Sequence, residues 1–122
     1  FNYSIKKLAV NSSCEYFAVN SIILYIGDIM KLEFKDLREM LIFNIKYYRY
    51  LNNYSQEKLA ELSSLSSRYI TDVERGLHCP TINKIEIIAK VLNVEPYEMF
   101  RNHEYDLNII QKMKISRQYN QK

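Results

Sequence analysis

The sequence is poor in the residues that β-turns require, with two glycines and two prolines among 122 residues. A sandwich of short strands needs many such turn residues, so their scarcity argues against that architecture. Runs rich in Leu, Ile, Lys and Glu favour helices instead, and the 48% hydrophobic content is enough for one real core. We therefore expect an all-α fold with one compact domain and extra segments at its ends.

Cysteine is scarce as well. Cys14 and Cys79 lie far apart and outside any C-x-x-C or Cys/His ligand spacing, so we expect no metal site. A disulfide between them stays open, but a secreted fold stapled by bridges normally has more cysteines in a shorter chain. Reduced thiols in a cytoplasmic protein are the expectation.

Long apolar runs and catalytic motifs are also missing. The apolar stretch 16–26 is interrupted at Asn20 and Ser21 and falls short of the roughly 20 residues that a membrane helix needs. Two basic residues before it leave a signal peptide open, although no small-residue cleavage site follows and Asp28 comes soon. Because no G-x-S-x-G, phosphate-binding loop or H-E-x-x-H motif occurs, we expect neither an enzyme nor a cofactor.

Most of the chain lacks an excess of either charge. The net charge is +3, yet residues 35–100 carry nine basic and nine acidic side chains, and residues 1–34 carry three of each. The excess lies in residues 101–122, with five basic residues against two acidic ones. Bulk charge therefore says little about nucleic-acid binding, which must rest on how a few charges are arranged on one face.

These patterns divide the chain into three segments. Residues 1–34 form an N-terminal extension without a sustained helical period, in which 22–26 indicate a short strand or an extended segment. Met30 could be the natural start, which would make the residues before it a leader. The helical domain spans 35–102, and 103–122 form a basic tail. An amphipathic helix can continue into this tail through Leu107, Ile110 and Met113.

Five helices are expected in the domain. The first spans 36–51 and ends at Asn52-Asn53, because asparagine tolerates the left-handed conformation. Ser55 caps the second, and the turn 63–65 follows it. The inward residues of the first helix recur every three or four positions, as Leu37, Leu41, Ile45, Tyr48 and Leu51; those of the second are Leu59, Ala60 and Leu62.

The remaining helices have equally clear boundaries. Ser66 caps the third helix, and Gly76 stops it in the left-handed conformation. Pro80 and Thr81 open the fourth, and the fifth begins at Pro96. The third turns Ile70 and Val73 inward, and the fourth has a buried stripe of Ile82, Ile85, Ile88, Ala89 and Leu92. The fifth helix is short and ends near Phe100.

The second and third helices and their turn form a helix-turn-helix unit, in which Ala60 lets the two helices approach closely. The distinctive residues are Ser55-Gln56-x-x-Leu59-Ala60, Leu65-Ser66, Ile70-x-x-Val73-Glu74-Arg75-Gly76 with Pro80, and Ile88-Ala89-x-x-Leu92-x-Val94 with Phe100. This pattern, over about residues 40–100, resembles the lambda-repressor-like (Cro/C1, xenobiotic-response-element type) family of bacterial and phage DNA-binding regulators.

The resemblance implies a sequence-specific regulator of transcription, a repressor in our interpretation, that reads the major groove of double-stranded DNA with helix 66–75. At the start of the second helix, Gln56 would then hydrogen-bond a phosphate with help from Ser55 and the helix N-terminus. The alternative is that Ser55 only caps the helix and Gln56 is an ordinary polar residue of its first turn.

The family's base-contacting positions are occupied here by Ser67, Arg68 and Asp72, with Ser66 and Thr71 beside them. Arg68 is the strongest candidate, because a guanidinium can bond guanine O6 and N7 together. The alternative is a solvated surface arginine. Asp72 either accepts a hydrogen bond from cytosine N4 or is held by Arg68, four residues earlier on the same face.

Other positions carry less specific expectations. Tyr69 either reaches the DNA backbone with its hydroxyl or packs beside the second helix. Arg75 and His78 are candidate phosphate contacts, and His78 could equally be an ordinary surface residue. Arg49 and Glu74 stand at positions that pair between the first and third helices in the family, which implies a structural ion pair.

The resemblance also implies partners. We expect a homodimer formed through the fifth helix and the tail, with an interface that includes Val94, Tyr97, Met99 and Phe100. The alternative is an antitoxin or another protein-interaction module, in which residues 1–34 or the tail would bind a toxin. A co-purified toxin would favour that alternative.

Overall fold

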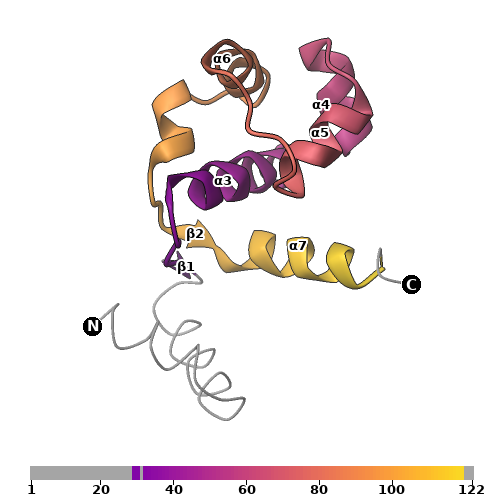
Figure 1. The fold of residues 1–122 in the computed structure, drawn as a ribbon. Helices are drawn as coiled ribbons and strands as arrows, with labels where there is room; N and C mark the ends of the chain where they lie inside the picture. Colours follow the sequence, from indigo (N-terminus) through magenta and orange to yellow (C-terminus); the bar gives the residue numbers. More distant parts are fainter. Residues whose placement is uncertain (1–28, 31, 120–122) are drawn as a thin grey trace. The chain divides into compact units, whose positions relative to one another are not determined.

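The computed structural model describes residues 29–30 and 32–119 (Figure 1). The chain divides into two compact units, one of which is residues 34–101. Of the described residues, the other unit contains 29–30, 32–33 and 102–119. The helix-turn-helix block lies wholly inside the first unit.

The first unit begins with α3 (Leu37–Leu51), which Asp36 caps by accepting a hydrogen bond from the backbone N–H of Glu39. The helix ends as predicted, with Asn53 in the left-handed conformation at φ 58°. Its central apolar residues Leu41, Ile45 and Tyr48 are buried. Two residues predicted on the same face are exposed, because they lie at the ends of the helix and beyond its packed middle: Leu37 and Leu51.

The helix-turn-helix consists of α4 (Gln56–Ser63) and α5 (Ser67–Glu74), which pack against each other (Figure 1). Ala60 at their contact is 2% exposed. Ser64 turns the chain in the left-handed conformation, with φ 57°. The prediction that Leu62 faces inward was wrong, since it is 43% exposed and Ser63 is buried instead.

The fourth helix, α6 (Ile82–Val91), is capped by the Thr81 hydroxyl and packs against α4. Most of its predicted stripe is buried: Ile85, Ile88, Ala89 and Leu92. Ile82 departs from the prediction with an exposed fraction of 68%. It is the first residue of the helix, so it lies outside the turns that pack against the core.

A 3-10 helix, η1 (Pro96–Phe100), takes the place of the short fifth helix and packs against α3 and α6. Its residue Met99 is fully buried, so the prediction that Met99 contributes to a dimer interface was wrong. Asn44 of α3 is also fully buried and donates hydrogen bonds from Nδ2 to the backbone oxygens of Met99 (2.8 Å) and Arg101 (2.9 Å). This side chain anchors η1 to α3.

The second unit contains a strand pair that the sequence did not predict. The strand β1 (Ile29–Met30) pairs antiparallel with β2 (Tyr105–Asp106), and Ile29 lies opposite Asp106. The helix α7 (Leu107–Tyr119) follows, as the apolar spacing of the tail had suggested, and its residues Leu107, Ile110 and Met113 are buried. The strand expected at residues 22–26 lies outside the described residues, and the Met30 start stays a prediction.

Within the described ranges, no helix is long and apolar enough to cross a membrane. Among the described residues, the first unit is a small bundle of helices, and the strand pair β1–β2 belongs to the second unit.

We predict that Asn44→Ala lowers the free energy of unfolding by about 1 to 3 kcal/mol, because the buried carbonyl of Met99 and the part-buried carbonyl of Arg101 lose their donor. Urea unfolding measures this change. The matched control is Asn83→Ala on an exposed position of α6, which should stay within about 0.5 kcal/mol of the parent protein. Similar effects of the two substitutions would contradict the anchoring role of Asn44.

Candidate nucleic-acid interface

The two faces of α5 have opposite environments. Ile70 and Val73 are fully buried and fix the helix to the core. Ser67 and Arg68 are exposed, and Thr71 and Asp72 are half-buried. A helix of eight residues is too short to be stable alone, so this buried face and the ends of the helix must hold it in place.

Both helices of the motif begin at a serine cap. The Ser55 hydroxyl accepts a hydrogen bond from the backbone N–H of Lys58, and the Ser66 hydroxyl accepts one from the N–H of Tyr69, each at 3.0 Å. Both serines are exposed. Because a hydroxyl that accepts a bond still carries its own proton, each cap could also donate to a phosphate.

The C-terminal end of α5 is fixed to α3 by the ion pair expected from the resemblance. The guanidinium of Arg49 meets the carboxylate of Glu74 through two contacts, Nε to Oε1 at 2.5 Å and Nη2 to Oε2 at 3.0 Å. Nη1 of Arg49 donates to the backbone oxygen of Tyr54 (2.9 Å). The two side chains are only 7% and 3% exposed.

The environment of Arg49 favours its charged form. Burial alone would lower the pKa of the guanidinium, but the hydrogen bond and the negative charge of Glu74, together with Tyr50, outweigh burial and raise it. The guanidinium also lies over the Tyr50 ring, 4.5 Å from the ring centre. Arg49 is therefore a permanent cation inside the fold, and Glu74 is the carboxylate that balances it.

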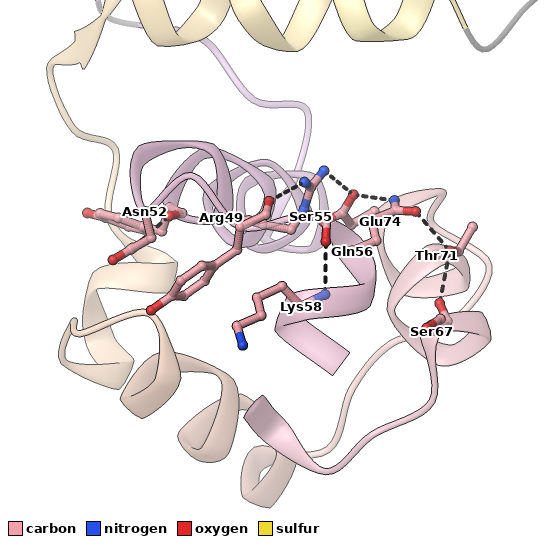
Figure 2. A network of polar contacts seen from close by, with 10 residues as sticks. Arg49, Asn52, Ser55, Gln56, Lys58, Ser67, Thr71 and Glu74 are labelled. Carbon is pink, nitrogen blue, oxygen red and sulfur yellow. Dashed lines mark hydrogen bonds and ion pairs between the residues drawn. The ribbon is translucent and has the colours of Figure 1, made fainter. Parts of the chain in front are cut away.

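Gln56 and Thr71 extend this ion pair into a longer network (Figure 2). Nε2 of Gln56 donates to Oε2 of Glu74 (2.7 Å), and the Thr71 hydroxyl lies 3.0 Å from Oε1 of Gln56. The network joins α3, α4 and α5. Sequence reasoning placed Gln56 and Thr71 near DNA but did not link them, since no local pattern marks a bond between residues on different helices.

The side chains of Arg68 and Asp72 on α5 form an ion pair. Nε of Arg68 lies 3.6 Å from Oδ2 of Asp72, and the Arg68 side chain is 89% exposed whereas that of Asp72 is 20% exposed. Surface pairs of this kind add little to stability. The contact instead biases the direction of the Arg68 side chain.

Tyr69 lies at the junction of α5 with the loop that follows and with α6. Its ring lies 5.4 Å from the His78 ring and 4.3 Å from Nζ of Lys84. Burial raises the pKa of the Tyr69 phenol, and the charge of nearby Cys79 adds to the rise. These contacts are with the loop and α6, and packing of Tyr69 beside α4 stays a prediction. His78 and Arg75 are exposed.

A second tie between α3 and the end of α5 was missed by sequence reasoning. Nη2 of Arg38 donates to the backbone oxygen of Gly76 (2.7 Å), and Gly76 has φ 79°, the left-handed stop that was predicted. Arg38, Glu39, Glu74 and Arg75 line an open hollow beside this contact. The described residues contain no group of three or more His, Cys, Asp or Glu side chains that could hold a metal ion.

We predict that Arg49→Ala lowers the free energy of unfolding by about 3 to 5 kcal/mol, because Glu74 would stay buried without its cation. The matched control is Lys58→Ala, which breaks the exposed pair of Lys58 and Glu61 (3.3 Å) and should cost under about 1 kcal/mol. Urea unfolding of both variants tests this difference. Equal losses would mean that the Arg49–Glu74 pair has no special structural role.

Known proteins are similar to this chain in the part that contains α4 and α5. The family model described as Helix-turn-helix (HTH_3) matches residues 45–99. The control protein C.SmaI of Serratia marcescens is 47% identical over 60 residues, which are 49% of this chain and 71% of that protein. A hypothetical transcription factor of Neisseria meningitidis is 34% identical over 65 residues, or 53% of this chain and 61% of that protein.

Solved structures agree with these matches. The crystal structure of the Neisseria transcription factor superposes with a TM-score of 0.56 and 27% identity, and the match covers 70% of this chain and 91% of that one. The restriction-modification controller protein C.Esp1396I superposes with a TM-score of 0.50 and 34% identity, over 55% of this chain and 90% of that one.

Proposed function

This chain belongs to the lambda-repressor-like helix-turn-helix family of DNA-binding transcriptional regulators, and we propose that it is a repressor that places α5 in the major groove of double-stranded DNA. The observation that supports this most is the division of α5 into two faces. Ile70 and Val73 fix the helix from within, while Ser67 and Arg68 stay exposed. Insertion into a groove needs a helix of this kind, rigidly held on one side and open on the other.

We propose that Arg68 reads a guanine and that Asp72 assists it. Asp72 faces Nε of Arg68, which leaves the two terminal nitrogens of the guanidinium to donate to guanine O6 and N7. Of the two roles considered for Asp72, base reader and helper, this contact favours the helper. Ser66 and Ser67 at the start of the same helix are exposed and complete the proposed reading surface.

Contacts with the DNA backbone would fix the register of the protein on the duplex. We propose one contact at the start of α4, where Ser55 and Gln56 stand beside the first free N–H groups of the helix. A second contact would come from Arg75 and His78, both exposed after α5, and from the phenol of Tyr69. A tyrosine phenol is protonated at neutral pH and can donate to a phosphate, and the raised pKa of Tyr69 is consistent with this.

We propose that the chain binds DNA as a homodimer, with one α5 in each of two half-sites about 34–36 Å apart. Three of the four predicted interface residues keep accessible surface. Tyr97 is 64% exposed, and Val94 and Phe100 are half-buried. Met99 belongs to the core and is removed from the interface. The role of the tail in dimerisation stays a prediction.

Two of the similar proteins suggest which genes this chain controls. One is a control protein and the other is a restriction-modification controller protein. We propose that this chain regulates a restriction-modification gene set. Protection of a promoter beside such genes in a footprint would support this, and protection only at unrelated promoters would argue against it.

The other expectations follow from this function. We propose that this regulator works in the cytoplasm and needs no catalytic activity or cofactor. The antitoxin alternative stays a prediction that a co-purified toxin would support.

We predict that Arg68→Ala weakens binding to the preferred site by about 1 to 3 kcal/mol and relaxes the requirement for one base, because the bidentate contact with guanine is lost. Fluorescence anisotropy against the preferred site and its single-base variants measures both effects. The matched control is Arg101→Ala, an exposed arginine at the other end of the domain, which should keep the base preference. If Arg68→Ala weakened binding equally on every sequence, Arg68 would be a phosphate contact.

A further inference from the structure

The network around Glu74 has a fixed direction of hydrogen bonding. A carboxylate only accepts, and the one of Glu74 receives bonds from Arg49 and from Nε2 of Gln56 at 2.7 Å. The amino side of the Gln56 amide must therefore face Glu74. Its carbonyl side then faces the Thr71 hydroxyl, which lies 3.0 Å away.

The proton of the Thr71 hydroxyl is engaged in a hydrogen bond within the protein. Among the residues that the structure describes, the two acceptors within its reach are Oε1 of Gln56 at 3.0 Å and the backbone oxygen of Ser67 at 2.9 Å. Both are acceptors, and a hydroxyl has one proton, so it bonds to one of them or is shared between them. In neither case does a proton remain that Thr71 could donate to a base edge.

The Gln56 amide, in contrast, still has a proton to give. An amide nitrogen carries two protons, and only one of them is directed to Glu74. Gln56 is half-buried at the first position of α4, next to the helix N-terminus. Glu74 and Thr71 grip the two ends of this amide from α5, so its plane is fixed before any ligand arrives (Figure 2).

We propose that Thr71 is a positioning residue that donates no hydrogen bond to a base and that orients the Gln56 amide, so that its second N–H meets a DNA phosphate. This inference rests on the proposed function, and it revises the expectation that Thr71 lies among the base readers. It also links the two tasks of the motif. The same Gln56 amide makes the proposed phosphate contact at the start of α4 and the hydrogen bonds that hold α5 in position.

Removal of the Thr71 hydroxyl frees one end of the amide, which can then rotate away from the phosphate. We expect Thr71→Val to weaken binding about 2- to 10-fold, the range for one neutral hydrogen bond. The loss should be the same on all sequences, because a phosphate carries no base identity. Thr71→Ser keeps the hydroxyl and should restore binding to within about twofold of the parent protein.

The experiment uses a site selected from random DNA and fluorescence anisotropy with Thr71→Val, Thr71→Ser, Gln56→Ala and the double variant Gln56→Ala with Thr71→Val. A set of duplexes, each with a single methylphosphonate in place of one phosphate, locates the phosphate on which Gln56 acts. The inference predicts that the double variant binds no more weakly than Gln56→Ala alone. It also predicts that methylphosphonate at that phosphate costs less in Thr71→Val than in the parent protein.

Two results would overturn the inference. A changed preference at one base position in Thr71→Val would make Thr71 a base reader, and additive losses in the double variant would separate it from Gln56. Thermal unfolding shows whether Thr71→Val is folded, and Thr71→Ala replaces it in the same tests if it is not. Failure of the parent protein to select any DNA site would instead refute the proposed function, so the two failures are distinguishable.

Discussion

The buried ion pair between Arg49 and Glu74 is the constraint on which the rest of the motif depends. A guanidinium and a carboxylate that are almost inaccessible to water must find each other, because either one alone would be a costly buried charge. The pair therefore allows α5 only one position against α3. Once that position is set, Gln56 can close onto the same carboxylate and bring the start of α4 into the arrangement.

Hydrophobic burial and polar contacts have different roles in this fold. Fully buried residues such as Ile45, Ile70 and Val73 supply the favourable free energy that holds three short helices together. Such packing is not directional, so it does not by itself fix how α5 turns about its own axis. The directional contacts do so. They act at both ends of the reading helix, through the Ser66 cap at its start and Glu74 at its last residue.

Local signals allowed much of the fold to be predicted from the sequence, because serine caps, left-handed stops and helical spacing act over a few residues. The errors came from packing. Helical spacing identified the inward face of each helix, but it did not show where a neighbouring element ends. Ile82 was therefore expected in the core although it is exposed, and Met99 was expected on the surface although it is buried. Hydrogen bonds between distant residues leave no pattern at all, which is why the Asn44 anchor, the β1–β2 pair and the link between Gln56 and Thr71 were missed.

Residues 35–100 carry no net charge, so DNA binding must come from a few placed side chains rather than from bulk attraction. Selection of bound sites from a random DNA pool tests this most directly. We expect enrichment of one two-fold symmetric sequence, with a guanine in each half-site and half-site centres about 10 base pairs, or a multiple of this, apart. Recovery of the pool without any enriched sequence would contradict it.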